Sequence, residues 1–219
     1  MPPPPPRIKI CGITSLDDAR LAVEAGAWAI GLILWPGSRR HCALPEAERI
    51  ARGLRRQVEV CGVFVNAPLQ EVVAVAEGVG LTMVQLHGDE GPAFCGEVAR
   101  RTGTRVVKAA RVRTTADVRA LETFHSDYHL LDAHVPGLRG GTGEPFDWQL
   151  AAARRSKVPL VLSGGLTHEN VGAAIAATQP DAVDTASGTE AAPGVKDPAK
   201  IVAFAAAVAA TAPVTEGVA

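Results

Sequence analysis

Apolar stretches and helical patterns alternate along almost the whole chain. The run at 27–34 (AWAIGLIL) is nearly continuous in apolar residues, which is typical of a strand covered on both faces. Helix-starting signals follow such runs, and Ser15 with Asp18 three residues later predicts a helix that extends to about residue 25. Eight strands are expected, at 7–11, 27–34, 58–65, 81–86, 105–109, 128–132, 158–163 and 181–184. The fifth helix is expected over 115–124, and the last helix over 198–210, after only a short turn from the eighth strand.

This repetition predicts an α/β fold, a (β/α)8 TIM barrel in a single domain. The strands recur at roughly the spacing of one strand–helix unit in a barrel of about 250 residues. The alternative is an open doubly wound sheet, which usually carries a G-x-G-x-x-G fingerprint in its first turn, and this sequence lacks that fingerprint. We expect the barrel over 7–211, a disordered Pro-rich tail over 1–6 and a flexible tail over 212–219.

Composition adds the cellular setting. Hydrophobic residues make up 47% of the 219 residues, enough for a large core, and 22 Lys and Arg against 23 Asp and Glu give a net charge of -1. Basic residues form no long run in the sequence, so we expect no nucleic-acid partner. The four cysteines show no C-x-x-C pair and no metal-ligand spacing with histidine, as expected for free thiols in a reducing compartment. Without a signal-peptide pattern or an apolar run long enough for a bilayer, the chain is expected to be soluble, cytoplasmic and free of membrane contacts.

Chemically active residues gather at the predicted C-terminal ends of the strands, where TIM barrels carry their active sites. Cys11 closes the first strand, Asp132 the sixth and Asp184 the eighth. Taken by itself, Cys11 is better explained as a small buried hydrophobe, because free cysteine is among the most buried residue types. Asp132 is as well suited to capping a helix as to catalysis. His87, after the fourth strand, is expected to support a site rather than to act in it.

Two glycine-bearing turns follow the seventh and eighth strands, which is where barrels commonly bind a phosphate group. Gly164 and Gly165 lie in the first turn, and Ser187 and Gly188 lie in the second. Backbone N–H groups at such turns bind anions without a lysine. Tight turning alone would explain one glycine pair, but two pairs at the two expected places favour a phosphate site. Arg40, on the loop after the second strand, is either a surface cation or a partner for a planar carboxylate.

Linked motifs that span nearly the whole chain resemble the phosphoribosylanthranilate isomerase family, in the same order and at the same spacing. They are 9–14 (KICGIT), 31–40 (GLILWPGSRR), 62–66 (GVFVN), 84–88 (VQLHG), 130–132 (LLD), 140–143 (GGTG), 146–148 (FDW), 162–166 (LSGGL), 169–170 (EN) and 184–188 (DTASG). The departures are small: the pair at 34–35 is Leu-Trp where two aromatic residues are usual, and Ala186 and Thr189 replace a common Ser and a common Val or Ile.

The resemblance implies an enzyme of tryptophan biosynthesis that performs an Amadori rearrangement of a phosphorylated sugar without a cofactor or metal. It maps the general base onto Cys11 and the general acid onto Asp132, and it places Asp184 in the site, where it helps to orient the substrate. Arg40 would then meet the anthranilate carboxylate, and the two glycine-bearing turns would hold the phosphate. A monomer or a homodimer fits the resemblance.

Two other functions are open at this point. A dual isomerase of histidine and tryptophan biosynthesis resembles the same barrel and reaction, but such enzymes typically have an Asp where Cys11 stands. A non-catalytic phosphate-binding barrel would keep the glycine-bearing turns, yet it has no reason to carry both Cys11 and Asp132 at strand ends.

Overall fold

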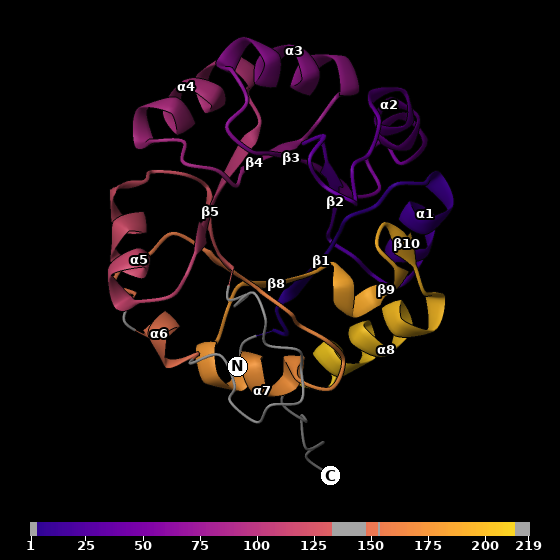
Figure 1. Cartoon of the computed structure of the whole chain (residues 1–219). Helices are drawn as coiled ribbons and strands as arrows, with labels where there is room; N and C mark the ends of the chain where they lie inside the picture. The colour runs from indigo at the N-terminus through magenta and orange to yellow at the C-terminus, as the bar shows by residue number, and fades with distance from the viewer. Residues whose placement is uncertain (1–3, 133–147, 153, 213–219) are drawn as a thin grey trace.

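Eight parallel strands close into a barrel, and helices surround it (Figure 1). The structure is a computed structural model that describes residues 4–132, 148–152 and 154–212. The strands are β1 (Arg7–Cys11), β2 (Ala29–Ile33), β3 (Glu59–Phe64), β4 (Met83–Leu86), β5 (Arg105–Arg111), β6 (Tyr128–Asp132), β7 (Leu160–Ser163) and β8 (Ala182–Thr185). The helices are α1 (Leu16–Glu24), α2 (Leu44–Gly53), α3 (Leu69–Val79), α4 (Pro92–Thr102), α5 (Thr115–Ala120), α6 (Gln149–Ala152), α7 (Val171–Thr178) and α8 (Pro198–Ala209). The predicted (β/α)8 barrel is confirmed.

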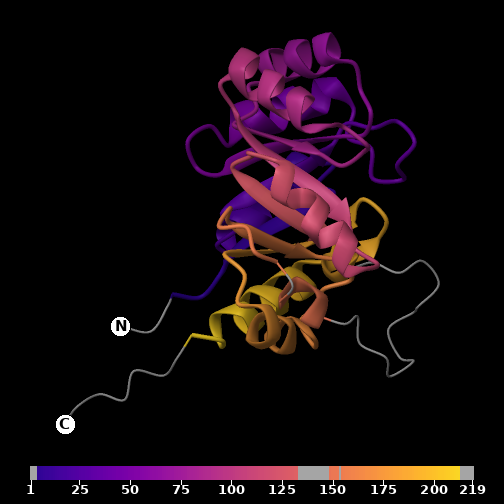
Figure 2. The same cartoon turned by 90° about the vertical axis from the view of Figure 1, so that its left-hand side faces the viewer.

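Closure of the barrel brings the first strand, β1, next to the last strand of the barrel, β8. β1 pairs with β2 on one side and with β8 on the other, and in the second pairing Lys9 lies opposite Asp184. Because side chains alternate between the two faces of a strand, Lys9 and Cys11 share the face that points into the barrel. Seen from the side, the strands cross the molecule obliquely and the helices lie outside them (Figure 2).

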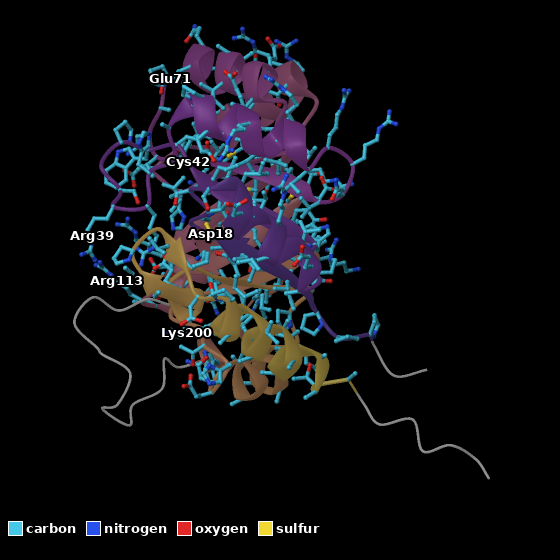
Figure 3. All side chains as sticks on the ribbon, turned by 90° about the vertical axis from the view of Figure 1, so that its right-hand side faces the viewer. Asp18, Arg39, Cys42, Glu71, Arg113 and Lys200 are labelled. Carbon is cyan, nitrogen blue, oxygen red and sulfur yellow. The ribbon has the colours of Figure 1, made fainter. Side chains whose placement is uncertain are left out.

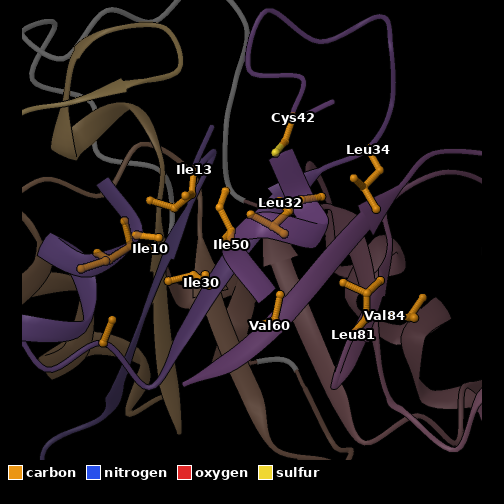
Figure 4. Close-up of a cluster of buried hydrophobic side chains, with 14 of the residues drawn as sticks. Ile10, Ile13, Ile30, Leu32, Leu34, Cys42, Ile50, Val60, Leu81 and Val84 are labelled. Atoms are coloured by element: carbon orange, nitrogen blue, oxygen red, sulfur yellow. The ribbon is translucent and has the colours of Figure 1, made fainter. Parts of the chain in front are cut away.

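The hydrophobic core has two layers. The larger one lies between the strands and the helices and includes Ile10, Ile30 and Leu32 from the strands and Ile50 from α2 (Figure 4). The smaller one fills the barrel interior; its buried members are Ala29, Cys61, Met83, Val107, Ala109, Tyr128, Leu130, Val161 and Ala182. Burial of strands on both faces explains the nearly continuous apolar runs of the sequence.

Local signals explain the helix boundaries. Ser15 caps α1 by accepting a hydrogen bond from the backbone N–H of Asp18 at 3.2 Å, as predicted. Thr114 and Asp117 form a reciprocal capping box at the start of α5. The fifth helix was expected to reach residue 124, but α5 ends at Ala120 and continues as a short 3₁₀ helix, η1 (Leu121–Thr123).

The connection between β8 and α8 was predicted wrongly. Instead of a short turn it contains a 3₁₀ helix, η2 (Ser187–Thr189), and an antiparallel hairpin of β9 (Glu190–Ala192) and β10 (Val195–Lys196). Strands this short carry no readable periodicity. The motifs at 140–143 and 146–147 and parts of both expected tails lie outside the described residues, so the domain boundaries stay predictions. Within the described part of the chain, no helix has the length and apolar character needed to cross a bilayer.

Candidate active site

Cys11 lies at the C-terminal end of β1, beside Gly31 on β2 and directly before Gly12. Its side chain is buried, and a Cβ atom at Gly31 on β2 would approach the Cys11 Sγ to 2.6 Å. Gly12, the next residue, has a φ of 76°, which lets the chain turn away sharply from the end of the strand. The thiol therefore occupies a pocket in which a larger side chain on the neighbouring strand would not fit.

A buried ion pair sits directly below the thiol. Lys9 Nζ donates to Asp184 Oδ1 at 2.8 Å, and Ser163 Oγ donates to Asp184 Oδ2 at 3.0 Å. The side chains of Lys9 and Asp184 are only 2% and 7% exposed. Burial lowers the pKa of Lys9, but the combined effects of the Asp184 carboxylate and of the Cys11 and Cys61 sulfurs are larger, so the pKa of Lys9 is raised. Burial also raises the pKa of the Cys11 thiol, and the Lys9 ammonium works in the opposite direction.

Asp132 lies at the end of β6, two strands away from β8, which carries Asp184. It pairs in register with Ser163 on β7, and its Oδ2 lies 3.3 Å from Nε2 of His87, with both side chains 20% exposed. The other ring nitrogen of His87, Nδ1, lies 3.0 Å from the Gln85 amide nitrogen. Asp132, Ser163, Asp184 and Lys9 thus lie on β6, β7, β8 and β1, four consecutive strands of the barrel. Within this group of strands, the negative charge of Asp184 is balanced by Lys9.

The two glycine-bearing turns lie against each other, as the phosphate prediction requires. Gly164 and Gly165 have φ values of 102° and 69°, a region that other residues rarely adopt. A Cβ at Gly188 would come well under 3.0 Å from the carbonyl oxygen of Leu166. Thr185 Oγ1 also donates to that carbonyl, at 2.7 Å. The turn after β8 therefore packs tightly on the turn after β7, and Ser187 opens the 3₁₀ helix η2 at this place.

Arg40 is not a free surface cation. Its Nε donates to Glu190 Oε1 at 2.8 Å and its Nη2 to Glu190 Oε2 at 2.7 Å. These hydrogen bonds raise the pKa of Arg40. Exposed Arg39 and Arg113 project from the same end of the barrel (Figure 3), so the rim of the site carries additional positive charge.

Beside His87 a cavity of about 500 Å³ opens over the ends of β3, β4 and β5. A second buried ion pair, Lys108 to Glu90 at 2.8 Å, lies in its wall. Glu90 also accepts hydrogen bonds from the backbone N–H groups of Asn66 and Gly88, at 2.8 and 2.9 Å. This pair holds the loop that carries His87. No group of three or more His, Cys, Asp or Glu side chains suited to a metal ion occurs among the described residues.

Three charged residues around Cys11 escaped the sequence interpretation: Lys9, Glu190 and Lys196. Lys9 had a readable signal, because it precedes Cys11 by two residues in a strand and must share its face. Glu190 and Lys196 had none, since the hairpin that carries them was not predicted.

The comparisons with known proteins agree with this geometry. Residues 8–207 match the family model described as N-(5'phosphoribosyl)anthranilate (PRA) isomerase. The chain is 48% identical over 195 residues to the N-(5'-phosphoribosyl)anthranilate isomerase of Citrifermentans bemidjiense, covering 89% of this chain and 93% of that protein. The corresponding protein of Rubrobacter xylanophilus is 47% identical over 191 residues, covering 87% and 92%.

Solved structures give the same result. The phosphoribosyl anthranilate isomerase of Thermotoga maritima superimposes with a TM-score of 0.82 at 42% identity, covering 93% of this chain and 98% of that one. A second structure of such an enzyme, in complex with reduced 1-(o-carboxyphenylamino)-1-deoxyribulose 5-phosphate, has a TM-score of 0.80 at 40% identity with the same coverage. With a family model over most of its length and relatives at this level of identity, the chain belongs to the N-(5'-phosphoribosyl)anthranilate isomerase family.

Proposed function

We propose that this chain converts N-(5'-phosphoribosyl)anthranilate into 1-(2-carboxyphenylamino)-1-deoxyribulose 5-phosphate in tryptophan biosynthesis, with Cys11 as general base and Asp132 as general acid. The observation that carries the assignment is the placement of a thiol and a carboxylate on one arc of the barrel mouth, beside two glycine-bearing turns. A non-catalytic phosphate-binding barrel would need the turns but not the thiol and the carboxylate.

The reaction needs an acid first and a base second. Asp132 gives a proton to the furanose ring oxygen as the C1–O bond breaks, and the anthranilate nitrogen forms a Schiff base with C1. Cys11, as the thiolate, then removes the proton from C2, and the electrons of that C–H bond move toward the Schiff-base nitrogen. The resulting enolamine takes up a proton at C1 and loses the proton of its C2 hydroxyl group, which gives the ketone at C2. No redox partner is needed, because the oxidation of C2 balances the reduction of C1.

The charges around Cys11 fit the second step. Burial raises the pKa of the thiol, which favours the neutral form in the resting enzyme. The ammonium of Lys9, held by Asp184, is the positive charge that most strongly favours the thiolate. In this proposal Asp184 orients Lys9, and Arg40 meets the anthranilate carboxylate. Gly164, Gly165, Ser187 and Gly188 bind the phosphate through backbone N–H groups.

The decisive experiment is a turnover assay. Purified protein is mixed with N-(5'-phosphoribosyl)anthranilate, and the loss of substrate fluorescence is followed against a no-enzyme control. Turnover supports the proposal, whereas tight binding of the substrate without turnover would leave only the phosphate-binding barrel. A parallel assay with the aminoaldose substrate of the histidine pathway decides whether the enzyme has dual specificity. The thiol at position 11 favours the single activity.

The setting of the enzyme is also a proposal. The four cysteines are unpaired and buried, which suits a reducing compartment such as the cytoplasm. Whether the protein is a monomer or a homodimer stays a prediction.

A further inference from the structure

The β9–β10 hairpin, which the sequence did not predict, lies next to β1 and α1 at the edge of the barrel mouth (Figure 1). It carries two charged residues that are almost completely buried, Glu190 with a side chain 4% exposed and Lys196 with a side chain 0% exposed. Buried charges are costly unless they are paired and hydrogen-bonded. Their partners therefore indicate what the hairpin does.

Glu190 holds the guanidinium of Arg40 along one edge. Both carboxylate oxygens are used, with Oε1 2.8 Å from Arg40 Nε and Oε2 2.7 Å from Arg40 Nη2. Oε1 also accepts from the backbone N–H of Gly194 at 3.2 Å. A Cβ at Gly12, the residue after Cys11, would meet Arg40 Cδ at 2.9 Å and Glu190 Oε1 at 3.3 Å. Arg40 is thus fixed in direction through Nε and Nη2, and its Nη1 group makes no hydrogen bond to Glu190.

Lys196 neutralises Glu190 from the other side. Its Nζ lies 3.5 Å from Glu190 Oε1. The same ammonium donates to the carbonyl oxygens of Cys11 at 2.7 Å and Ala186 at 3.0 Å. Lys196 therefore joins the end of β1 to the turn after β8 while it balances the carboxylate that holds Arg40.

The three side chains carry two positive charges and one negative charge, a net charge of +1. Arg40 is the exposed member, with a side chain 24% exposed against 4% for Glu190. Burial opposes ionisation of Glu190, but its hydrogen bonds from Arg40 and the charge of Lys196 keep its pKa below the ordinary value. The surplus positive charge of this cluster is therefore presented at Arg40. A surface pair such as Arg100 with Glu97, in contrast, has no net charge.

We propose that Glu190 is a positioning residue for recognition of the substrate carboxylate. It orients the Arg40 guanidinium so that the N–H groups not bound to Glu190 face the site. Lys196 balances the negative charge of Glu190, so that Arg40 still attracts an anion. The inference rests on the proposed function, because it takes the anthranilate carboxylate as the ligand of Arg40.

Positioning and simple charge effects predict opposite results for Glu190→Gln. The substitution keeps the size of the side chain but raises the net charge of the cluster to +2. If Arg40 acted only through its charge, a carboxylate ligand would bind more tightly to this variant. If Glu190 aims the fork, loss of the paired charge-assisted hydrogen bonds lets Arg40 move, and the same ligand binds more weakly, by about ten-fold.

The experiment measures the Kd of two ligands by calorimetry: reduced 1-(o-carboxyphenylamino)-1-deoxyribulose 5-phosphate and its counterpart without the carboxyl group. Glu190→Gln should weaken the first ligand and leave the second within two-fold, roughly. Glu97→Gln, which removes an exposed Glu–Arg pair of similar geometry on α4, is the matched control and should change neither. Tighter or unchanged binding of the carboxylate ligand to Glu190→Gln would overturn the proposal.

A second measurement does not depend on how well that variant folds. In Arg40→Ala, added ethylguanidinium should restore part of the affinity for the carboxylate ligand, because Glu190 offers it the same two-oxygen site. Rescue that is equally strong in the double variant Arg40→Ala/Glu190→Gln would refute a positioning role. Turnover of the wild-type protein is measured in a separate assay. If there is no turnover, the isomerase proposal fails, but the comparison of binding affinities still shows whether Glu190 positions Arg40.

Discussion

Replacing Lys9 with methionine tests the buried ion pair under the thiol. Lys9 and Asp184 are nearly inaccessible to water and 2.8 Å apart, so the substitution leaves a buried carboxylate with Ser163 as its remaining side-chain donor. Breaking a buried pair from one side costs about 3–5 kcal/mol. For a domain of this size each kcal/mol lowers Tm by about 2–4 °C, so we expect a fall of about 6–20 °C.

The double variant Lys9→Met/Asp184→Asn separates charge from packing. It removes both charges while Asn can still accept from Ser163, so most of the lost stability should return. The assay is urea unfolding followed by circular dichroism, with the four species of a double-mutant cycle compared at equal denaturant slope. A loss below about 1 kcal/mol for Lys9→Met, or losses that simply add in the double variant, would refute the account of a strongly coupled buried pair.

Lys9→Met should also shift the pH dependence of kcat/KM. The proposed base is the Cys11 thiolate, so kcat/KM should rise with pH as the thiol deprotonates. Burial raises the pKa of Cys11 and Lys9 lowers it. Loss of the ammonium therefore shifts the rising limb to higher pH. Three other charged groups act on this thiol, Asp184, Lys196 and Arg40, and all of them remain in place in Lys9→Met. If the rising part of the kcat/KM profile stays at the same pH in Lys9→Met, Lys9 does not influence the ionisation of Cys11 during the reaction.

Three further changes test the remaining site residues. Cys11→Ser should lower kcat by about 10²–10⁴ with affinity for the reduced product analogue within a few-fold, and near-normal turnover would remove Cys11 from the mechanism. Asp132→Asn should be similarly damaging but should spare a substrate already in the open Schiff-base form; equal loss on both substrates would make Asp132 structural. Gly188→Ala should push the two phosphate turns apart and weaken binding of inorganic phosphate in calorimetry. Gly78→Ala, at a position with open space, is its control, and unchanged phosphate affinity in Gly188→Ala would contradict the phosphate assignment.

The sequence was most informative where one strand or turn carries its own signal. β1 and β6 were predicted with their observed bounds because each is a short stretch that holds a few apolar residues, Ile8 and Ile10 in β1 and Leu130 and Leu131 in β6. Their ends then located Cys11 and Asp132. The pairing of Lys9 with Asp184 spans 175 positions in sequence and exists only because the barrel closes between β1 and β8. No local pattern contains that information.

The hairpin shows a second kind of limit. β9 and β10 have three and two residues, shorter than the window in which alternation can be recognised. Glu190 and Lys196 therefore carried no signal that could be read from the sequence. Arg40 was expected on the loop after the second strand, but its partner Glu190 lies 150 residues away and could not be predicted from that loop. Long-range ion pairs of this type follow from topology and are found only once the fold is known.

The burial of Cys11 also bears on how the enzyme withstands oxidants. Peroxides attack thiolates that solvent can reach, so a protonated and enclosed thiol forms sulfenic acid slowly. Cys11 is 6% exposed, and burial raises the pKa of its thiol. The other cysteines are no better targets, because burial raises the pKa of Cys61 to about 12 and that of Cys42 and Cys95 to about 11. Enclosure and a raised thiol pKa would therefore protect the proposed base of this barrel during episodes of oxidative stress.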